Sequence, residues 1–258
     1  GSEGRGLAML RAWAADLHLH TFLSPCASRD MSPGAVVRRC REVGLDIVAI
    51  TDHNTAGNVA RAIAEATSGP ATGLVVIPGM EVCTSEELHV LTLLPNLPRA
   101  AEWDAAVRRA LTPGENMPEV FGEQWVQDAS TGAISSEAGL LAAPTRLPLA
   151  DVVSQVTALG GVCIPSHVDR AAFSILGQLG FVPEGLDIAG LEISRAIGRE
   201  EALLRLPHIA GYGLISSSDA HSLGEIGLGC ALLWIEEPTV AEIMLALRGA
   251  SGRRVEIE

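Results

Sequence analysis

The sequence has few aromatic residues and few positive charges. Phe, Trp and Tyr together make up 3% of its 258 residues, and the net charge at pH 7 is −13. Proteins that bind nucleic-acid backbones use Arg and Lys to neutralise phosphates, and single-strand binders add aromatic side chains on which bases stack. We therefore do not expect stable binding to nucleic acid, although an acidic surface is compatible with a local positive site built from metal ions.

Paired cysteines and long apolar runs are also missing. The five cysteines are an odd number and show no C-x-x-C spacing, and Cys40, Cys83, Cys163 and Cys230 lie in apolar runs typical of reduced core residues. No apolar run reaches about 18 residues, so we expect no transmembrane helix. The N-terminus has no basic region followed by an apolar segment, as a secretory signal would. These features predict a cytoplasmic protein.

Two common catalytic signatures are absent. No G-x-G-x-x-G follows the first strand-like run, so a dinucleotide site lacks its usual signature, and no G-x-S-x-G carries a serine nucleophile. The sequence does contain 48% hydrophobic and 19% charged residues, which indicates a folded domain. Its length fits a single β/α barrel, which typically takes about 250 residues.

Short strand-like runs alternate with helical patterns along most of the chain. Strands are expected at 14–21, 46–53, 73–82, 88–94, 162–167, 187–194, 211–221 and 229–236, and helices at 31–44, 56–66, 148–161, 171–179, 198–206 and 239–249. The first helix begins with Ser32 as N-cap and Pro33 behind it. This alternation predicts parallel βαβ units. Residues 96–150 break the rhythm after one helix at 99–111, and we interpret them as an insertion or cap within a single domain at 9–258.

The motif DLHLHT, at residues 16–21, places two histidines two residues apart on an expected strand. His18 and His20 would share one face, which suggests a common partner such as a metal ion. Other strands also carry metal-type side chains at their ends, namely His53, Glu81, His89, His167, Asp219 and His221. Helix capping explains some acidic residues individually. Because functional groups of β/α barrels gather at strand ends, one shared metal site explains all of them together.

The ordered motifs DLHLHT, ITDHN, PGMEV, LHVL, IPSHVDR and SSSDAHS resemble the PHP (polymerase and histidinol phosphatase) phosphoesterases over nearly the whole chain. The resemblance implies an α/β fold, a distorted seven-stranded β/α barrel of the TIM-like kind, with two or three divalent ions: Zn, Mn or Fe. It implies that His18, His20, Glu81 and Asp219 hold one ion, that Glu81, His89 and His167 hold a second with Glu81 bridging, and that His53 and His221 help to hold a third.

The third ion is where the sequence departs from this family. Members often supply a His or Asp a few residues after the H-x-H pair, and the residue at that spacing here is Cys26. A thiolate is a good zinc ligand, so Cys26 can complete the site. Asp30 is the alternative ligand. In a third interpretation Cys26 only packs under the loop, and the third site is weak or empty.

The expected reaction is hydrolysis of a phosphate ester. Two ions about 3.5–4 Å apart can bridge a water and lower its pKa, and the hydroxide can attack phosphorus in line. Glu81, Asp219, His221 and Arg170 are the predicted catalytic residues. Arg170 and Arg195 are candidate phosphate ligands, because Arg binds phosphate bidentately, although an ordinary ion pair also explains Arg195.

The expected substrate is a small phosphorylated metabolite or nucleotide, cleaved by a phosphatase or phosphodiesterase. One alternative is an exonuclease-like activity on short oligonucleotides, which the acidic charge disfavours. Another is a metal-binding PHP module without turnover, which the near-complete ligand set disfavours. A more remote one is hydrolysis of a carbon–nitrogen bond, as in amidohydrolases. His208 lies away from the strand ends and is expected to be a surface histidine or a mobile acid for the leaving group.

Overall fold

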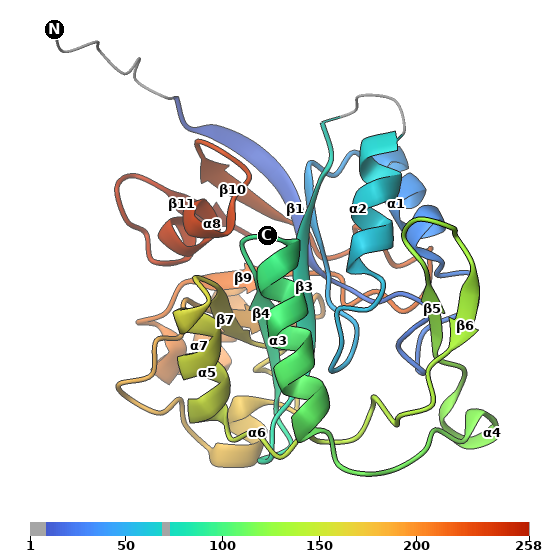
Figure 1. The fold of residues 1–258 in the computed structure, drawn as a ribbon. Helices are drawn as coiled ribbons and strands as arrows, with labels where there is room; N and C mark the ends of the chain where they lie inside the picture. The colour runs from blue at the N-terminus through green and yellow to red at the C-terminus, as the bar shows by residue number, and fades with distance from the viewer. Residues whose placement is uncertain (1–8, 69–72, 258) are drawn as a thin grey trace, which may run out of the picture.

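The computed structural model describes residues 9–68 and 73–257. Residues 1–8, on which the expectation about a secretory signal rests, lie outside this part. The main feature is a seven-stranded sheet with the strand order β11–β10–β1–β2–β3–β4–β7 (Figure 1). These strands are β1 Arg11–Leu19, β2 Ile47–Ile50, β3 Val75–Cys83, β4 His89–Leu93, β7 Val162–Pro165, β10 Ala231–Ile235 and β11 Arg254–Glu256.

The strands of this sheet do not all run parallel, as the alternation predicted. β1, β2 and β3 are parallel neighbours, whereas β4 pairs antiparallel with both β3 and β7, and β10 pairs antiparallel with β1. Only residues 84–88 join β3 to β4. A parallel crossover needs roughly a dozen residues or more. A connection as short as this one therefore forces a hairpin. The prediction of parallel units is therefore wrong for β4 and β10.

A second, smaller sheet lies beside the first. Its two strands, β8 Leu191–Ile193 and β9 Leu214–Ser216, pair parallel. Single bridges join it to the main sheet, from Ile188 to Cys163 and from Ala220 to Leu19. The structure confirms an α/β fold with a curled seven-stranded sheet. This sheet is open, because only isolated bridges connect it to the segments beside β8 and β9. The closed seven-stranded barrel is therefore not confirmed.

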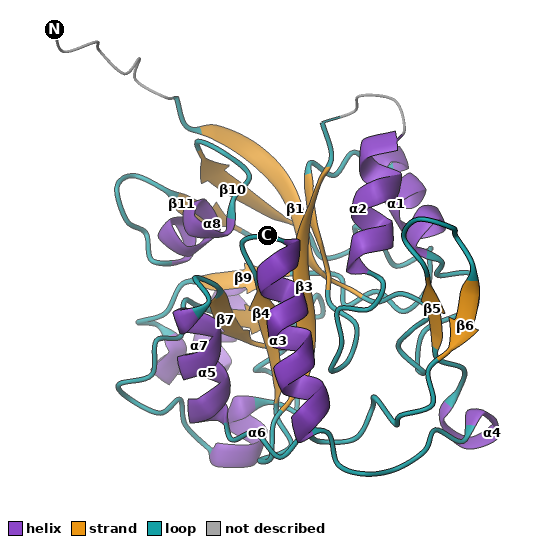
Figure 2. Cartoon of the chain, viewed as in Figure 1, coloured by secondary structure: helices purple, strands orange, loops and turns teal. Residues whose placement is uncertain are grey.

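The helices flank the sheets, as Figure 2 shows. They are α1 Pro33–Glu42, α2 Val59–Ser68, α3 Leu97–Ala110, α4 Pro118–Phe121, α5 Leu149–Ala158, α6 Ile175–Leu179, α7 Arg199–Arg205 and α8 Val240–Leu247, with a 3₁₀ turn η1 at Pro207–Ile209. Ser32 caps α1 as predicted, because its side chain accepts the Ala35 N–H. Among the described helices, none is long and apolar enough to cross a membrane.

Alternate apolar side chains of neighbouring strands form one core cluster of the curled sheet. It includes Leu17, Ala49, Ile77, Leu91 and Ile164, from β1, β2, β3, β4 and β7 respectively. The period of two places every second residue of a strand on the same face of the sheet. The core thus fixes the positions of the strand ends that carry the polar motifs.

The segment 96–150 has two different parts. α3 belongs to the core, since Trp103 is fully buried and donates from Nε1 to Thr92 Oγ1 at 3.0 Å. Residues 112–146 instead run along the surface with α4 and the hairpin of β5 Trp125–Gln127 and β6 Ile134–Ser136 (Figure 1). This part approaches the loop after β1, where a Cβ on Gly122 would lie 1.9 Å from the Pro25 carbonyl oxygen. Its role as a cap stays a prediction.

Candidate metal centre

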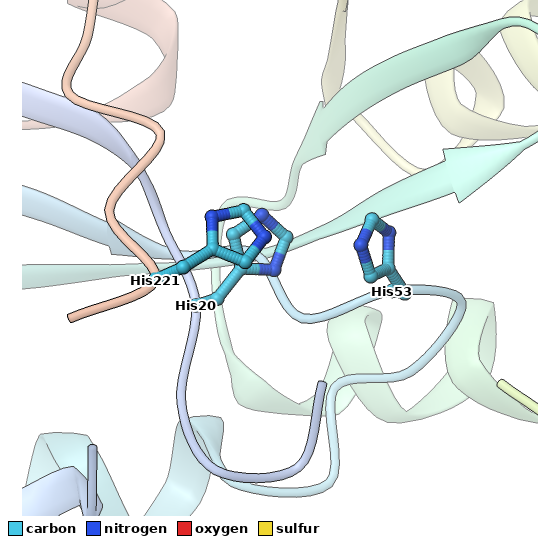
Figure 3. A group of neighbouring side chains, drawn as sticks. All are labelled: His20, His53 and His221. Atoms are coloured by element: carbon cyan, nitrogen blue, oxygen red, sulfur yellow. The ribbon is translucent and has the colours of Figure 1, made fainter. Parts of the chain in front are cut away.

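The structure brings eight metal-type side chains together from six separate segments. These segments are the end of β1, the loop after β2, β3, the start of β4, and the loops after β7 and β9. The side chains are His18, His20, His53, Glu81, His89, His167, Asp219 and His221. Figure 3 shows three of them, His20, His53 and His221, with their rings close together. All eight are residues that the sequence predicted as ligands.

Glu81 lies at the centre of this cluster and is buried. Its Oε1 lies 3.1 Å from His89 Nδ1 and 3.2 Å from His18 Nε2. Its Oε2 lies 3.1 Å from His53 Nδ1. The Nε2 atoms of two further histidines, His20 and His167, each lie 3.5 Å from the carboxylate. One carboxylate thus contacts five imidazoles.

Asp219 forms a second acidic contact in the cluster. Its Oδ1 lies 3.3 Å from His18 Nε2 and 3.4 Å from His20 Nε2. Its Oδ2 accepts a hydrogen bond from Arg170 Nη1 at 2.7 Å. Burial alone would raise the pKa of the Asp219 carboxyl. The neighbouring His18 and His20 rings outweigh burial, so the pKa lies below its ordinary value. The carboxylate is therefore ionised at neutral pH.

The charges of Glu81 and His18 are coupled in the same way. Burial alone would raise the pKa of Glu81, but the rings of His89 and His18 hold it well below its ordinary value. Burial would lower the pKa of His18, and the carboxylates of Glu192 and Glu81 raise it well above the ordinary value. In His20, burial and the neighbouring His221 lower the pKa. The cluster thus combines ionised carboxylates with at least one neutral imidazole.

The donor set fits divalent metal ions. The side chains form three groups, and within each group the possible ligand atoms lie within 4.8 Å of one another. The groups are His18, His20 and Asp219; His53, Glu81 and His89; and His20, His53 and His221. Within the described residues, one buried atom of the cluster, His167 Nδ1, has no hydrogen-bond partner. Buried polar atoms are rarely left unpaired unless an ion or water takes the place. Imidazole and carboxylate donors suit Zn, Mn and Fe.

These groups differ in part from those that the resemblance implied. His53 joins Glu81 and His89 in one group, in the place expected for His167. His167 lies at the same carboxylate, 3.5 Å from Glu81 Oε1, but is a member of none of the three groups found in the described residues. His20 belongs to two groups, so the first and third sites share a ring.

Cys26 lies against the group of His20, His53 and His221. It is exposed as a residue and belongs to none of the three ligand groups found in the described residues. Burial alone would raise the pKa of the thiol, but the interactions of the sulfur with the His221 and His53 rings outweigh burial and bring the pKa to about 6. Asp30 is exposed, and no hydrogen bond or ion pair in the described part of the chain joins it to the cluster. The lowered pKa of its thiol therefore favours Cys26 over Asp30 as the residue next to this group.

Several buried groups hold the ligand rings in place. Glu192 Oε2 lies 3.0 Å from His18 Nδ1, and the same carboxylate accepts the backbone N–H of His167. Asp52 accepts the Ser24 hydroxyl at 2.7 Å, and Ser24 Oγ lies 2.9 Å from His20 Nδ1. Such partners fix the orientation of a metal-binding imidazole. Sequence reasoning missed Glu192, although a single Glu in the apolar strand 187–194 was a signal.

The backbone at two strand ends is strained. His167 has φ 32° and Asp219 has φ 51°, in the left-handed region that favours glycine. Asn54, beside His53, has φ 52°, and its side chain donates to the carbonyls of Leu141 and Ala143. Asn54 therefore ties the His53 loop to the surface segment and does not cap α2, which begins at Val59. Strain of this kind is frequent at functional sites.

A cavity of about 270 Å³ opens onto the cluster. It is lined by His53, Glu81, His89, His167, Arg170, Ala172, Phe173, Asp219 and His221. Arg170 is thus at the predicted place. Arg195 lines a different cavity and pairs with Glu225 at 2.7 Å. His208 is exposed in η1 and lines neither cavity among the described residues.

Comparisons with known proteins agree with this geometry. The model of the PHP domain family matches residues 16–181. No curated protein matches the sequence significantly. The lesion-specific endonuclease PfuEndoQ from Pyrococcus furiosus has a similar fold, with a TM-score of 0.68 and 19% identity over 95% of this chain, which spans 58% of the endonuclease chain.

Two smaller proteins share the fold as well. A putative metal-dependent phosphoesterase from Bifidobacterium adolescentis is 22% identical, with a TM-score of 0.53 over 81% of this chain and 88% of its own. An amidohydrolase from Chromobacterium violaceum is 21% identical, with a TM-score of 0.54 over 83% of this chain and 89% of its own. At these identities the likeness concerns the fold, whereas the family model covers most of the chain, from the H-x-H motif through His167. The protein therefore belongs to the PHP domain family.

Proposed function

We propose that this protein is a metal-dependent hydrolase that cleaves the phosphate ester of a small phosphorylated compound. The observation that carries the proposal is the position of Glu81, which contacts five imidazoles at a cavity of about 270 Å³ that Arg170 also lines. A pocket of this size takes a small ligand, since sites for drug-sized molecules span roughly 300–1,000 Å³.

The three groups of neighbouring donors would hold the ions. When bound, divalent ions supply an activated water and neutralise the charge of phosphoryl oxygens. Within the chain, Glu81 keeps the rings of His53 and His89 together, and Glu192 holds His18 with its Nε2 atom toward Glu81 and Asp219.

Arg170 is the side chain that we expect to bind the substrate phosphate. Of the described residues that line the cavity, it is the only arginine. Its side chain is 43% exposed, and one of its guanidinium nitrogens donates to Asp219 Oδ2. The planar guanidinium has further N–H groups, so it can retain Asp219 while it donates to phosphoryl oxygens.

A second candidate is an endonuclease that acts on DNA, which the fold of PfuEndoQ favours. This chain spans 58% of that protein. The net charge of −13 also weakens attraction to a DNA backbone. We therefore rank endonuclease activity second, and the experiment below includes a DNA substrate to test it.

Hydrolysis of a carbon–nitrogen bond is a weaker alternative, although the amidohydrolase from Chromobacterium violaceum shares the fold. Many such sites would use a carboxylated lysine as a bridging ligand. The sequence contains no lysine, since all 18 residues of the Lys and Arg total are arginines. In our proposal Glu81, which lies 3.1 Å from both His53 Nδ1 and His89 Nδ1, takes the bridging role instead.

The test is a release assay on protein loaded separately with Zn, Mn and Fe. Substrates are nucleoside monophosphates, sugar phosphates and a DNA duplex with an abasic site, and Glu81→Gln is the control. We expect phosphate release from the small substrates, abolished in the variant. Cleavage of the duplex without release from any small ester would favour the endonuclease, and inactivity of the loaded protein on all three classes would contradict both.

A further inference from the structure

Phe173 presents an aromatic ring at the cavity of the candidate metal centre. It lies in the loop between β7 and α6, lines the cavity together with Arg170, and is 43% exposed. Aromatic residues make up only 3% of the chain. Phe173 belongs to none of the hydrophobic core clusters of the described residues, and its ring lies beside imidazoles and carboxylates.

The backbone holds Phe173 in this position at a cost. Its φ is 55°, a conformation that is an outlier for a bulky residue. The Phe173 carbonyl accepts the His89 N–H at 2.8 Å, and the next residue, Ser174, caps α6 through the Gly177 N–H. Upstream, the Asp169 carboxylate accepts the backbone N–H of Ser194 at 2.6 Å. Hydrogen bonds therefore hold the loop on both sides of Phe173, and they maintain its strained backbone conformation.

One face of the Phe173 ring contacts a histidine of the candidate metal centre. Phe173 stacks on His89, with centroids 4.7 Å apart and an interplanar angle of 20°. His89 Nδ1 in turn lies 3.1 Å from Glu81 Oε1. The ring is thus one side chain away from the carboxylate at the centre of the site, and Arg170 is three residues away in the same loop.

We propose that the exposed part of Phe173 is a stacking platform for a planar aromatic ring of the substrate, with the phosphate directed to Arg170 and the metal centre. The inference rests on the proposed function and narrows it to phosphate esters that carry a nucleobase. Aromatic side chains stack on every base, because each base has a π-face. The base could belong to a free nucleotide or to a nucleotide of a single strand, and the contacts with phosphate and ring would be the same.

A purely structural role for Phe173 predicts a different result. If the ring only supports His89, its replacement would weaken metal binding and slow all substrates alike. Phe173→Leu keeps an apolar side chain beside His89 but removes the aromatic face. Phe173→Trp enlarges that face. Phe181 is a matched control, because it is 59% exposed and lies outside the lining of the cavity.

The experiment compares KM for a deoxynucleoside monophosphate with KM for glycerol phosphate in the wild type, Phe173→Leu, Phe173→Trp and Phe181→Leu. We expect Phe173→Leu to raise KM for the nucleotide about tenfold, within the range measured for base–aromatic stacking, and to leave glycerol phosphate unchanged. Phe173→Trp and Phe181→Leu should keep the nucleotide KM. Equal effects of Phe173→Leu on both substrates, or loss of bound metal, would overturn the proposal.

Calorimetric binding separates this proposal from the proposed function. The same proteins are titrated with the deoxynucleoside monophosphate and with a short single-stranded oligonucleotide, without reliance on turnover. If the wild type releases no phosphate from any ester but binds the nucleotide about tenfold more tightly than Phe173→Leu, the platform stands and the phosphoesterase assignment fails. Equal affinities of the two proteins for both ligands would refute the platform. Tighter binding of the oligonucleotide would identify a strand as the source of the base.

Discussion

Glu192 Oε2 lies 3.0 Å from Nδ1 of His18 in the interior of the protein. The Glu192 carboxylate can accept a hydrogen bond from Nδ1 of His18 and so orients the ring. Nε2 of His18 then faces Glu81 and Asp219, at 3.2 and 3.3 Å. Since Glu192 also accepts the backbone N–H of His167, one buried side chain positions residues from two strand ends.

We predict that Glu192→Gln lowers metal affinity by about 10- to 100-fold, the range typical of groups that orient a ligating histidine. The amide can donate to His18 and reverse the direction of this hydrogen bond. Competition with a chelator measures the affinity. Glu200→Gln, on the exposed side of α7, is the control. Wild-type affinity in Glu192→Gln would mean that His18 is oriented by other contacts.

We predict that Glu81→Gln reduces kcat more than about 100-fold, beyond the upper end for residues that only support a ligand. The reason is that Glu81 contacts five imidazoles, and a neutral amide would leave them without their shared negative charge. His208→Ala, in the exposed turn η1, should keep wild-type kcat. Steady-state assays at saturating metal compare the two. Similar rates in both variants would contradict a central role for Glu81.

We predict that Arg170→Ala lowers kcat/KM by about 10- to 100-fold, because a hydrogen bond to a charged group contributes roughly 1.5–3 kcal/mol. Arg170→Lys should recover only part of this loss, since lysine cannot bind phosphate bidentately. Arg195→Ala is the matched comparison. Its guanidinium pairs with Glu225 and lines another cavity, so we expect little change in kcat/KM. A larger loss in Arg195→Ala than in Arg170→Ala would reverse this assignment.

We predict a pH-dependent effect of Glu137→Gln on stability. Burial raises the pKa of the Glu137 carboxyl, but the hydrogen bond from Arg108 at 2.8 Å outweighs it and lowers the pKa below its ordinary value of 4.5. The unfolded chain then binds protons more readily, so the contribution is present above pH 4.5 and is lost as the pH falls through the folded pKa.

Urea unfolding at several pH values checks this prediction. At pH 7, Glu137→Gln should lose about 0.5–1 kcal/mol, as expected for a partly exposed ion pair, and the difference should shrink in acid. Glu119→Gln, exposed on α4, should be neutral at every pH. A loss in Glu137→Gln that does not change between pH 7 and the acid range would show that the ion pair is not its cause.

The sequence predicted which side chains gather in the cluster because strand ends are visible in it. An apolar run followed by His, Asp or Glu identifies both the strand and the end that carries the side chain, as at His53 and His167. Cap chemistry is equally local, and Ser32 was predicted correctly for that reason. These features depend on a few neighbouring residues, so no knowledge of the tertiary structure was needed.

Most of what the sequence did not predict depends on contacts between distant residues. The antiparallel direction of β4 is an exception, because the short connection between the expected strands 73–82 and 88–94 already indicates a hairpin, whereas alternating hydrophobicity does not encode strand direction. Glu192 belongs to no spacing motif, and its role appears only when β8 lies beside His18. Arg195 follows a strand end but is paired by Glu225, 30 residues further along the chain.

The last prediction concerns Cys26, whose thiol pKa is lowered to about 6 by interactions with the His221 and His53 rings. If this sulfur completes a third site, Cys26→Ala should lose one bound ion per chain, and Cys26→His should retain it. Both variants should fold normally, because the residue is exposed. Elemental analysis after loading with zinc or manganese counts the ions. A thiolate ligand should favour zinc over manganese at this position, because zinc prefers the softer donor.

Asp30→Ala decides between the two residues of this loop. Because no ion pair or hydrogen bond of the described residues joins Asp30 to the cluster, we expect this variant to bind as many ions as the parent. If Asp30→Ala loses an ion and Cys26→Ala does not, Asp30 is the ligand, and the loop must move to reach the site. Treatment with peroxide gives an independent readout: an accessible thiolate oxidises readily, so the parent should lose the third ion on oxidation, whereas Cys26→His should keep it.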